Sequence, residues 1–203
     1  MHPSVELYSG LIFVLSFWIL GPSGTSTGSM LSPLIYWLFV LFLLELFLIL
    51  AVIDLKHLIL PDSLIISGVA ITLIYGVGDR FFLKSNGSIL SLNNFFAAIL
   101  AFLFFFSIWF FSKGRGIGLG DAKFAILIGL VFGPFGSLMV LYCAVVLGTL
   151  VGLTLLIAKK TDIKTKLPLG TFIAISASVY ILAGPVLIPK LMEIFRFIPF
   201  IIN

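Results

Sequence analysis

The chain has 203 residues, of which 61% are hydrophobic and only 10% are charged. This composition excludes an ordinary soluble domain and indicates an integral membrane protein, which we predict to be an all-α polytopic helix bundle. The net charge of +4 does not indicate nucleic-acid binding, because the Lys and Arg residues lie in short loops between apolar runs.

Seven apolar segments are predicted to cross the membrane, since a helix needs about 20 residues to span the hydrocarbon core. The segments cover residues 5–21, 33–53, 63–78, 91–112, 122–133, 136–157 and 168–188. The fifth is short, and Gly133-Pro134 predicts a tight turn after it, so six crossings with one re-entrant segment is the alternative. The first resembles a signal-peptide core, but no Lys or Arg precedes it, and we expect it to be retained.

The distribution of basic residues predicts the orientation in the membrane. If the segments alternate sides, one set of loops holds most of the Lys and Arg residues, and such loops face the cytoplasm. These residues are Lys56, Lys113, Arg115, Lys123, Lys159, Lys160, Lys164 and Lys166. The N-terminus is then cytoplasmic and the C-terminus outside the cytoplasmic (inner) membrane. We expect residues 1–203 to form one transmembrane domain with its core at 33–188, and residues 189–203 to form an interfacial tail.

The first candidate site residue, Asp54, closes an apolar run just before the break at Leu60-Pro61. Pro61 disfavours helical geometry at Leu60, so Asp54 is expected on the last turn of a helix. An ionisable group at the edge of the hydrocarbon core costs free energy and usually has a function. The structural alternative is an interfacial Asp paired with Lys56 or His57.

The second candidate, Asp121, closes a run of alternate glycines that ends in Gly118-Leu119-Gly120-Asp121. Glycines allow close approach of a second chain, so we expect Gly118 and Gly120 to support the binding of an extended peptide. The structural alternative is that Asp121 caps a helix starting at Ala122. A phosphate cradle is disfavoured, because no Gly-Lys-Ser/Thr follows and the run ends in an anion.

Both Asp residues fall at the predicted cytoplasmic ends of helices, where they can meet. Two close carboxylates titrate as one unit and hold a single proton between them. The anion then activates water while the protonated group donates to a substrate carbonyl. No metal or cofactor is expected, since Cys143, His2 and His57 form no cluster with metal-ligand spacing. Cys143 itself is expected to be a small buried hydrophobe.

Two motifs carry a resemblance to a known family. They are Asp54 followed by Leu60-Pro61-Asp62, and Gly118-Leu119-Gly120-Asp121-Ala122-Lys123. They resemble the motifs of the type IV prepilin leader peptidases. The opening residues 2–13 also resemble that family's entry into its first helix, and Leu-Pro-Leu-Gly-Thr-Phe at 167–172 resembles its late Pro-x-Gly-x-Phe turn.

The resemblance covers nearly the whole chain in order, and it has functional implications. It implies that Asp54 and Asp121 form an aspartyl protease site at the cytoplasmic face. Its substrates are then prepilins or pseudopilins, which are cut after a Gly that precedes an apolar helix.

One departure from the family limits this expectation. Longer members carry an N-terminal cytosolic portion with paired CxxC motifs, which is linked to methylation of the new N-terminus. This chain starts past that portion and has a single Cys, so the resemblance does not extend to the N-methyltransferase activity. A peptidase-only form, a separate partner chain that carries the missing portion, and a start placed too late are three interpretations.

Lys123 and Asp62 are predicted to be substrate-binding or supporting residues, and the role of Glu45 is left open. Lys123 is expected to keep Asp121 ionised or to contact substrate, with a snorkelling interfacial Lys as the alternative. Asp62 is expected to cap a helix that starts at Ser63. Glu45 lies inside an apolar run, and we expect a protonated packing residue or a hydrogen bond to another helix.

The leading hypothesis is therefore a membrane-embedded aspartyl endopeptidase for prepilins or pseudopilins, which shares the lipid bilayer with its substrate and binds no nucleic acid. An alternative from another class is a small transporter in which Glu45, Asp54 and Asp121 form a proton pathway. That hypothesis is disfavoured, because Asp54 and Asp121 are predicted at one face. A third hypothesis is a non-catalytic assembly factor that binds prepilins.

Overall fold

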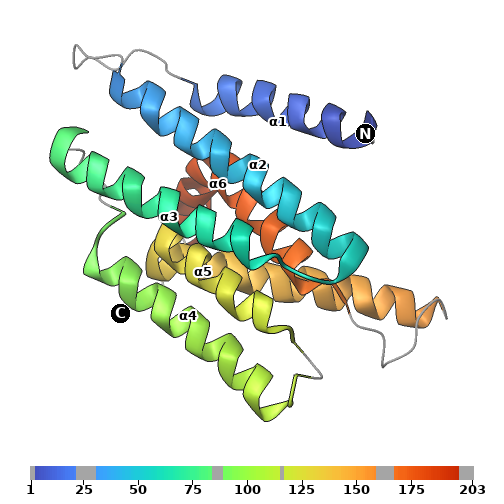
Figure 1. Cartoon of the computed structure of the whole chain (residues 1–203). Helices are drawn as coiled ribbons and strands as arrows, with labels where there is room; N and C mark the ends of the chain where they lie inside the picture. Colours follow the sequence, from blue (N-terminus) through green and yellow to red (C-terminus); the bar gives the residue numbers. More distant parts are fainter. Residues whose placement is uncertain (1–2, 22–30, 84–88, 115–116, 159–166, 197–203) are drawn as a thin grey trace.

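The computed structural model describes residues 3–21, 31–83, 89–114, 117–158 and 167–196, and within these ranges the chain forms helices and no strands (Figure 1). The helices are α1 (Pro3–Leu20), α2 (Leu31–His57), α3 (Asp62–Gly78), α4 (Leu92–Phe111), α5 (Leu119–Ile157) and α6 (Leu169–Arg196), and a short π-helix, η1 (Asp79–Leu83), continues α3. This arrangement confirms the predicted all-α bundle.

Four helices are long and apolar enough to cross a membrane. They cover Ser32–His57, Asp62–Phe81, Leu92–Phe111 and Leu119–Ile157. Two shorter apolar helical segments, Glu6–Leu20 and Leu169–Gly184, accompany them. The hydropathy that predicted membrane segments thus coincides with helix in each of these stretches, as expected where lipid offers the backbone no hydrogen bonds.

Helix α5 combines the predicted fifth and sixth segments. A straight helix of its 39 residues would be about 58 Å long, roughly twice the hydrocarbon core. The helix is instead broken at Gly133, whose φ of 66° and ψ of −170° are not helical, and Pro134 follows. The break divides α5 into a first arm (residues 119–132) and a second arm (residues 134–157).

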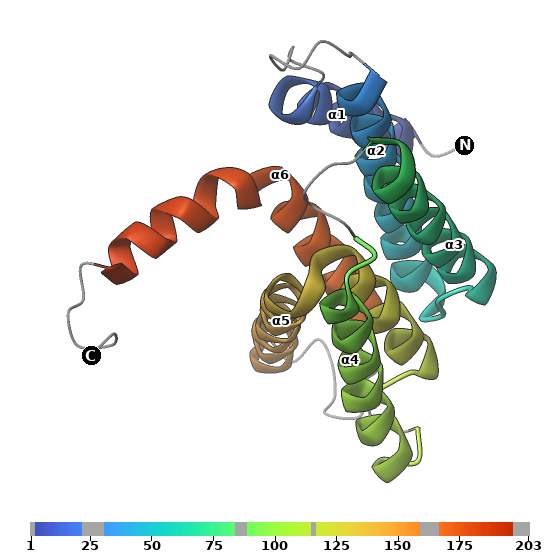
Figure 2. The same cartoon turned by 90° about the vertical axis from the view of Figure 1, so that its left-hand side faces the viewer.

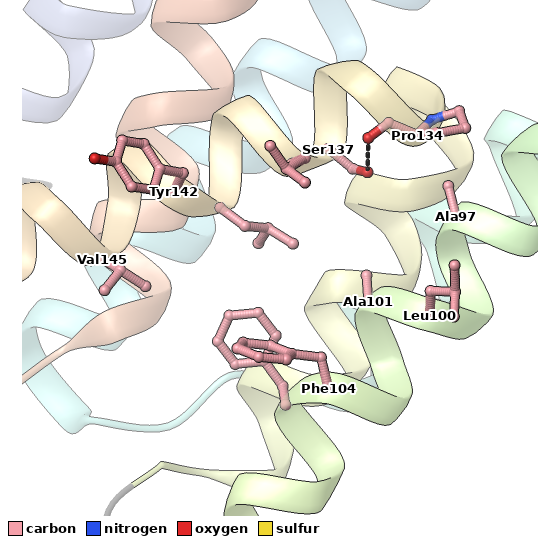
Figure 3. Close-up of a pocket in the computed structure, with 11 residues that line it drawn as sticks. Ala97, Leu100, Ala101, Phe104, Pro134, Ser137, Tyr142 and Val145 are labelled. Carbon is pink, nitrogen blue, oxygen red and sulfur yellow. Dashed lines mark hydrogen bonds between the residues drawn. The ribbon is translucent and has the colours of Figure 1, made fainter.

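Contacts with α4 show that the two arms run in opposite directions. In the first arm, Gly129 lies against Ala98, whereas Ala122 belongs to the cluster that contains Phe105, so this arm is antiparallel to α4. The second arm runs alongside α4 in the same direction, from Pro134 onwards (Figure 3). The chain therefore turns back at Gly133-Pro134, where the sequence predicted a tight turn.

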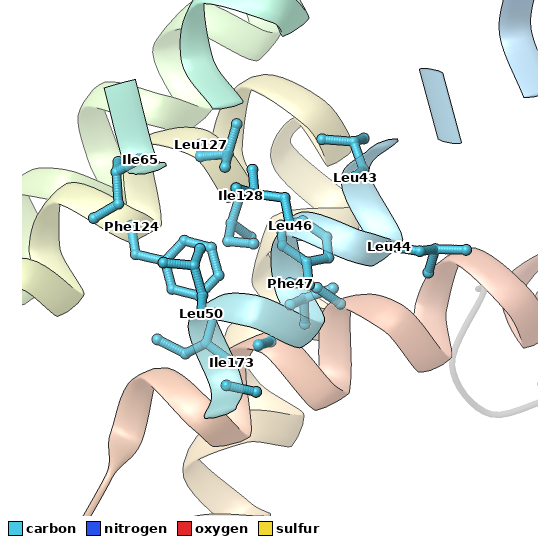
Figure 4. Close-up of a cluster of buried hydrophobic side chains, with 14 of the residues drawn as sticks. Leu43, Leu44, Leu46, Phe47, Leu50, Ile65, Phe124, Leu127, Ile128 and Ile173 are labelled. Atoms are coloured by element: carbon cyan, nitrogen blue, oxygen red, sulfur yellow. The ribbon is translucent and has the colours of Figure 1, made fainter. Parts of the chain in front are cut away.

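The main core lies where α2 meets the first arm of α5 and the beginning of α6. Phe47 and Phe124 are fully buried, with ring centroids 5.7 Å apart, and Ile173 of α6 lies in the same cluster (Figure 4). Among the four long apolar helices, α2 has the largest buried share. This central position of α2 brings its C-terminal turn close to the N-termini of α5 and α6.

Helix α1 packs along α2 at the edge of the bundle (Figure 1). Phe13 and Phe17 both make edge-on contacts with Trp37, with ring centroids 5.5 and 5.7 Å apart. Between the two helices, Ser9 Oγ donates a hydrogen bond of 2.9 Å to Glu45 Oε1. The expectation that Glu45 bonds to another helix is thereby confirmed.

Helix α6 continues past the predicted end of its span at residue 188, as far as Arg196. Figure 2 shows that its later part bends away from the bundle. The division into a core at 33–188 and an interfacial tail at 189–203 stays a prediction. Several residues named in the sequence predictions lie outside the described residues: His2, Arg115, Lys159, Lys160, Lys164, Lys166 and residues 197–203.

A cavity of about 490 Å³ lies between α4 and the second arm of α5 (Figure 3). Its walls are almost entirely apolar, and Tyr142 is the one titratable residue among them. Neither Asp54 nor Asp121 lines it.

Cys143, next to Tyr142, is exposed, so the prediction of a buried Cys is wrong. The outer face of a membrane helix accepts an apolar side chain as readily as the core does.

Candidate active site

Asp54 lies on the last turn of α2, as the sequence predicted. The helix ends at His57, and Leu58 follows with a φ of 54°, a conformation common just after a helix and unusual for Leu. The Leu58 N–H donates to the Asp54 carbonyl oxygen at 2.8 Å. Only 4% of Asp54 is exposed, so its carboxylate needs partners within the protein.

Those partners come from Thr171, in the first turn of α6. The Thr171 backbone N–H donates to Asp54 Oδ2 at 2.7 Å. The Thr171 side-chain oxygen lies 3.1 Å from the same Oδ2 and 3.1 Å from the carbonyl oxygen of Ala51. One residue of α6 thus makes both hydrogen bonds that the structure shows on the Asp54 carboxylate. The predicted alternative pairing with Lys56 or His57 is wrong, because both of these residues are exposed.

Asp121 lies in the first turn of α5. The helix begins at Leu119 with Gly118 as its N-cap, and the Gly118 N–H donates to Asp121 Oδ2 at 3.0 Å. Asp121 is therefore the third residue of the helix, and the alternative that it caps a helix starting at Ala122 is wrong. Its side chain reaches back to the backbone, as an acidic residue does at this position of a capping box. It is 8% exposed.

Gly170 lies beside both carboxylates. A Cβ atom on Gly170 would be 3.0 Å from Asp54 Oδ2, and the Gly170 backbone N–H interacts with the Asp121 carboxylate. Asp121 also experiences the charge of Asp54 directly. The start of α6 therefore joins the end of α2 to the start of α5, and it brings the two Asp carboxylates together around Gly170.

Leu60 packs between two glycines and holds the three helix ends together. A Cβ atom on Gly120 would lie 3.0 Å from Leu60 Cβ, and one on Gly170 would lie 2.8 Å from Leu60 Cδ1. Leu60 is 7% exposed. The close approach of these helix ends leaves little room for a side chain at either position, since an added Cβ would press on Leu60 or on the Asp54 carboxylate.

The glycines therefore serve packing in the structure. Gly118 is extended, with a φ of −76° and a ψ of 149°, but Leu119 and Gly120 already belong to α5. The predicted strand-like stretch is thus shorter than expected. Support for an extended peptide by Gly118 and Gly120 stays a prediction.

Lys123 and Asp62 form an ion pair, with 2.6 Å between Lys123 Nζ and Asp62 Oδ2. Asp62 is the first residue of α3, and Pro61 is the N-cap, without any side-chain capping bond. The prediction that Asp62 caps a helix starting at Ser63 is therefore wrong. The pair lies at the surface and ties the start of α3 to the first turn of α5, two residues after Asp121.

The carboxylates are bonded asymmetrically. Oδ2 of Asp54 accepts both hydrogen bonds from Thr171, whereas Oδ1 of Asp54 accepts none from the described residues. Asp121 accepts from Gly118 at Oδ2 and also meets the Gly170 N–H. The unbonded oxygen of Asp54 is left for a shared proton, a water molecule or a substrate carbonyl. Among the described residues, no group of three or more His, Cys, Asp or Glu could hold a metal ion.

Comparison with known proteins assigns the chain to a family. The profile of the type IV leader peptidase family matches residues 37–153, which is more than half of the sequence. The chain belongs to the type IV leader peptidase family. The match includes Asp54, Asp62, Asp121 and Lys123. Together with the apolar helices, family membership indicates a membrane protein.

Two curated relatives carry the name prepilin leader peptidase/N-methyltransferase. The protein of Xanthomonas campestris pv. campestris is 26% identical over 188 residues, which are 90% of this chain and 59% of that relative. The protein of Stutzerimonas stutzeri is 28% identical over 188 residues, which are 90% of this chain and 58% of that relative. The chain thus spans less than two thirds of the length of these relatives. No solved structure matches it.

The sequence did not predict that the start of α6 contacts both Asp carboxylates in this member of the leader peptidase family. Residues 167–172 were noted as a turn that resembles the family, but no role followed for Gly170 or Thr171. Both lie beyond the matched residues 37–153. The two Thr171 hydrogen bonds to Asp54 join residues 117 positions apart, and spacing along one sequence does not predict such a contact. The Pro and Gly that precede Thr171 were the available signal for a helix start.

Proposed function

We propose that this chain is a membrane-embedded aspartyl endopeptidase that removes the leader peptide of type IV prepilins or pseudopilins, with Asp54 and Asp121 as its catalytic residues. The observation that carries the proposal is the convergence of two buried carboxylates on the first turn of α6, at Gly170 and Thr171. The names of the two curated relatives support the substrate class.

The proposed reaction needs one proton between the two carboxylates. The ionised Asp takes a proton from water as the hydroxide oxygen attacks the scissile carbonyl carbon, and the protonated Asp gives its proton to the carbonyl oxygen. A tetrahedral gem-diol forms. Its collapse breaks the C–N bond, returns a proton from the diol to one carboxylate, and passes the other Asp's proton to the leaving amine. The pair ends with one proton, as it began.

The proposal places this chemistry at the cytoplasmic face. Lys56 at the end of α2, Lys113 after α4 and Lys123 in α5 all lie at the end of the bundle that holds the two Asp residues, which fits the excess of cytoplasmic Lys and Arg in membrane proteins. The N-terminus is then cytoplasmic and the C-terminus outside the inner membrane. Cleavage is proposed after a Gly, just before the apolar helix of the substrate.

The substrate helix and the enzyme would share one bilayer, which confines their encounter to two dimensions. The proposal covers the peptidase step alone.

Lys123 and Asp62 are proposed as supporting residues that keep α3 next to the first turn of α5 through their ion pair.

The experiment is leader removal from a co-expressed prepilin, followed by a mobility shift on a gel. We expect the wild type to cleave, and Asp54→Asn and Asp121→Asn each to reduce cleavage by at least about 100-fold, because each amide removes an acid–base group without changing side-chain size. Glu45→Gln is the matched control, since it makes the same change from carboxylate to amide in α2, at the contact with α1 and away from the site, and keeps an acceptor for Ser9.

Cleavage that survives in either Asp variant contradicts the catalytic assignment. Loss of cleavage in Glu45→Gln would instead favour a proton pathway through all three carboxylates. No cleavage by the wild type, tested with several prepilins, contradicts the proposed function.

A further inference from the structure

Thr171 is the residue that anchors Asp54. It is 2% exposed, and its backbone N–H and side-chain hydroxyl both meet Oδ2, at 2.7 and 3.1 Å. No other described residue makes a hydrogen bond to the Asp54 carboxylate. The orientation of this carboxylate therefore depends on α6, whereas Asp121 accepts from Gly118, the N-cap of its own helix, in addition to its contact with Gly170 of α6.

The Thr171 hydroxyl lies between two acceptors. Its oxygen is 3.1 Å from Asp54 Oδ2 and 3.1 Å from the Ala51 carbonyl oxygen, but it has a single proton to donate. When Asp54 is ionised, the carboxylate is the stronger acceptor and receives this proton. When Asp54 is protonated, its carboxyl group is a weaker acceptor, and the hydroxyl turns to the Ala51 carbonyl oxygen. The same hydroxyl thus has a hydrogen-bond partner in both protonation states.

Thr72 shows what a buried threonine in this bundle does without such a role. It is completely buried, and its hydroxyl donates to the carbonyl oxygen of Gly68, one turn earlier in its own helix, at 2.7 Å. That bond is the common arrangement for Ser and Thr within helices. Thr171 instead reaches across to another helix and to a carboxylate, so its polar contacts involve the site and not its own helix.

We propose that Thr171 is a positioning residue for the peptidase reaction: it holds Asp54 by Oδ2, leaves Oδ1 turned to water and substrate, and follows the proton as Asp54 changes its protonation state. This inference rests on the proposed function. The backbone N–H supplies one of the two bonds whatever the side chain is, so the hydroxyl can be tested separately from the position of α6.

The test uses the full-length protein in detergent micelles with a purified prepilin that the wild type cleaves, and it measures kcat and KM separately. Thr171→Val keeps the branched shape but removes the hydroxyl. We expect kcat to fall by about 10- to 100-fold, the value of one hydrogen bond to a charged group, with KM nearly unchanged. Thr171→Ser restores the hydroxyl, and we expect it to recover most of kcat.

Thr72→Val is the matched control, because it removes a buried hydroxyl away from the site. We expect this variant to cleave as the wild type does. The thermal unfolding midpoint in micelles is measured for both Val variants, to separate loss of folded protein from loss of turnover.

The inference is overturned if Thr171→Val retains the wild-type kcat, if its loss appears only in KM, or if Thr171→Ser is as slow as Thr171→Val while both are folded. It is also overturned if Thr72→Val lowers kcat equally. A wild type that cleaves no prepilin overturns the proposed function itself, which separates that failure from the failure of this inference.

Discussion

The first arm of α5 has a turn end at Gly133 and a site end at Asp121, and the two ends are bonded in different ways. At each end the backbone leaves a regular helix, glycines allow close approach, and a polar side chain meets the exposed backbone. At the turn end, Asn94 Nδ2 donates to the Leu130 carbonyl oxygen at 2.9 Å, and Gly133 lies against the Asn94 side chain. At the site end, Asp121 accepts from Gly118.

The difference lies in what remains unbonded. Asn94 also interacts with Ser91, the N-cap of α4, through Ser91 Oγ at 2.8 Å, so both ends of its amide have a partner. At the site end, Oδ1 of Asp54 has no hydrogen bond from the described residues. In a structural polar cluster every polar atom has a hydrogen-bond partner, whereas a cluster with an unbonded carboxylate oxygen retains capacity for chemistry. The comparison teaches that this unbonded oxygen, and not the glycines, distinguishes the site.

Gly129→Ala should have the largest effect on stability. Gly129 lies between the two ends of the first arm and determines how closely α4 packs on it. A Cβ atom at Gly129 would collide with the backbone of Ala98, which cannot move aside as a side chain can. We expect loss of folded protein, measured by size-exclusion chromatography and thermal unfolding in micelles. Gly10→Ala in α1 is the control, since nothing lies within 4 Å of its added Cβ. A stable Gly129→Ala would mean that the helices are packed less closely than the structure shows.

Gly170→Ala should abolish activity while the bundle stays folded. The added Cβ would be 2.8 Å from Leu60 Cδ1 and 3.0 Å from Asp54 Oδ2, so the carboxylate must shift, and misplacement by about 1 Å can cost 100-fold in rate. Prepilin cleavage by the purified variant measures this loss. Gly78→Ala makes the same change at an open position and should cleave normally. Full activity in Gly170→Ala would show that Asp54 does not need its present position.

Asn94→Ala should destabilise the turn end without affecting catalysis. It leaves the buried Leu130 carbonyl oxygen without its side-chain partner, at a cost of about 1–3 kcal/mol. The expected result is a lower unfolding midpoint with unchanged kcat. Asn93→Ala, one residue earlier and exposed, should change neither. If Asn94→Ala lowers kcat at an unchanged midpoint, the two ends are coupled and the comparison fails.

The Asp62–Lys123 pair should have the smallest effect. The two side chains are 56% and 37% exposed, and exposed ion pairs contribute about 0.2–1 kcal/mol. We expect Asp62→Asn and Lys123→Met to lower the unfolding midpoint slightly and to change kcat less than Thr171→Val does. A double-mutant cycle on the midpoint measures the coupling. A large loss of cleavage in Lys123→Met alone would instead assign Lys123 a direct contact with substrate.

Hydropathy and local motifs determined much of this protein in advance. The apolar runs predicted helices for each described segment, because a backbone in lipid must satisfy its own hydrogen bonds. Pro61 predicted the end of α2 near Asp54, and Gly133-Pro134 predicted the turn within α5, because Pro and Gly act on the backbone locally. The two carboxylates were conspicuous because charge is costly in an apolar chain.

The tertiary structure alone decided what each of these residues contacts. Asp62 was expected to cap its helix and instead pairs with Lys123, 61 residues away, and Cys143 was expected inside and lies outside. The anchoring of Asp54 by Thr171 depends on the packing of α6 against α2. Helix-to-helix contacts follow from the fit of many side chains at once, whereas a sequence shows only which residues are neighbours along the chain.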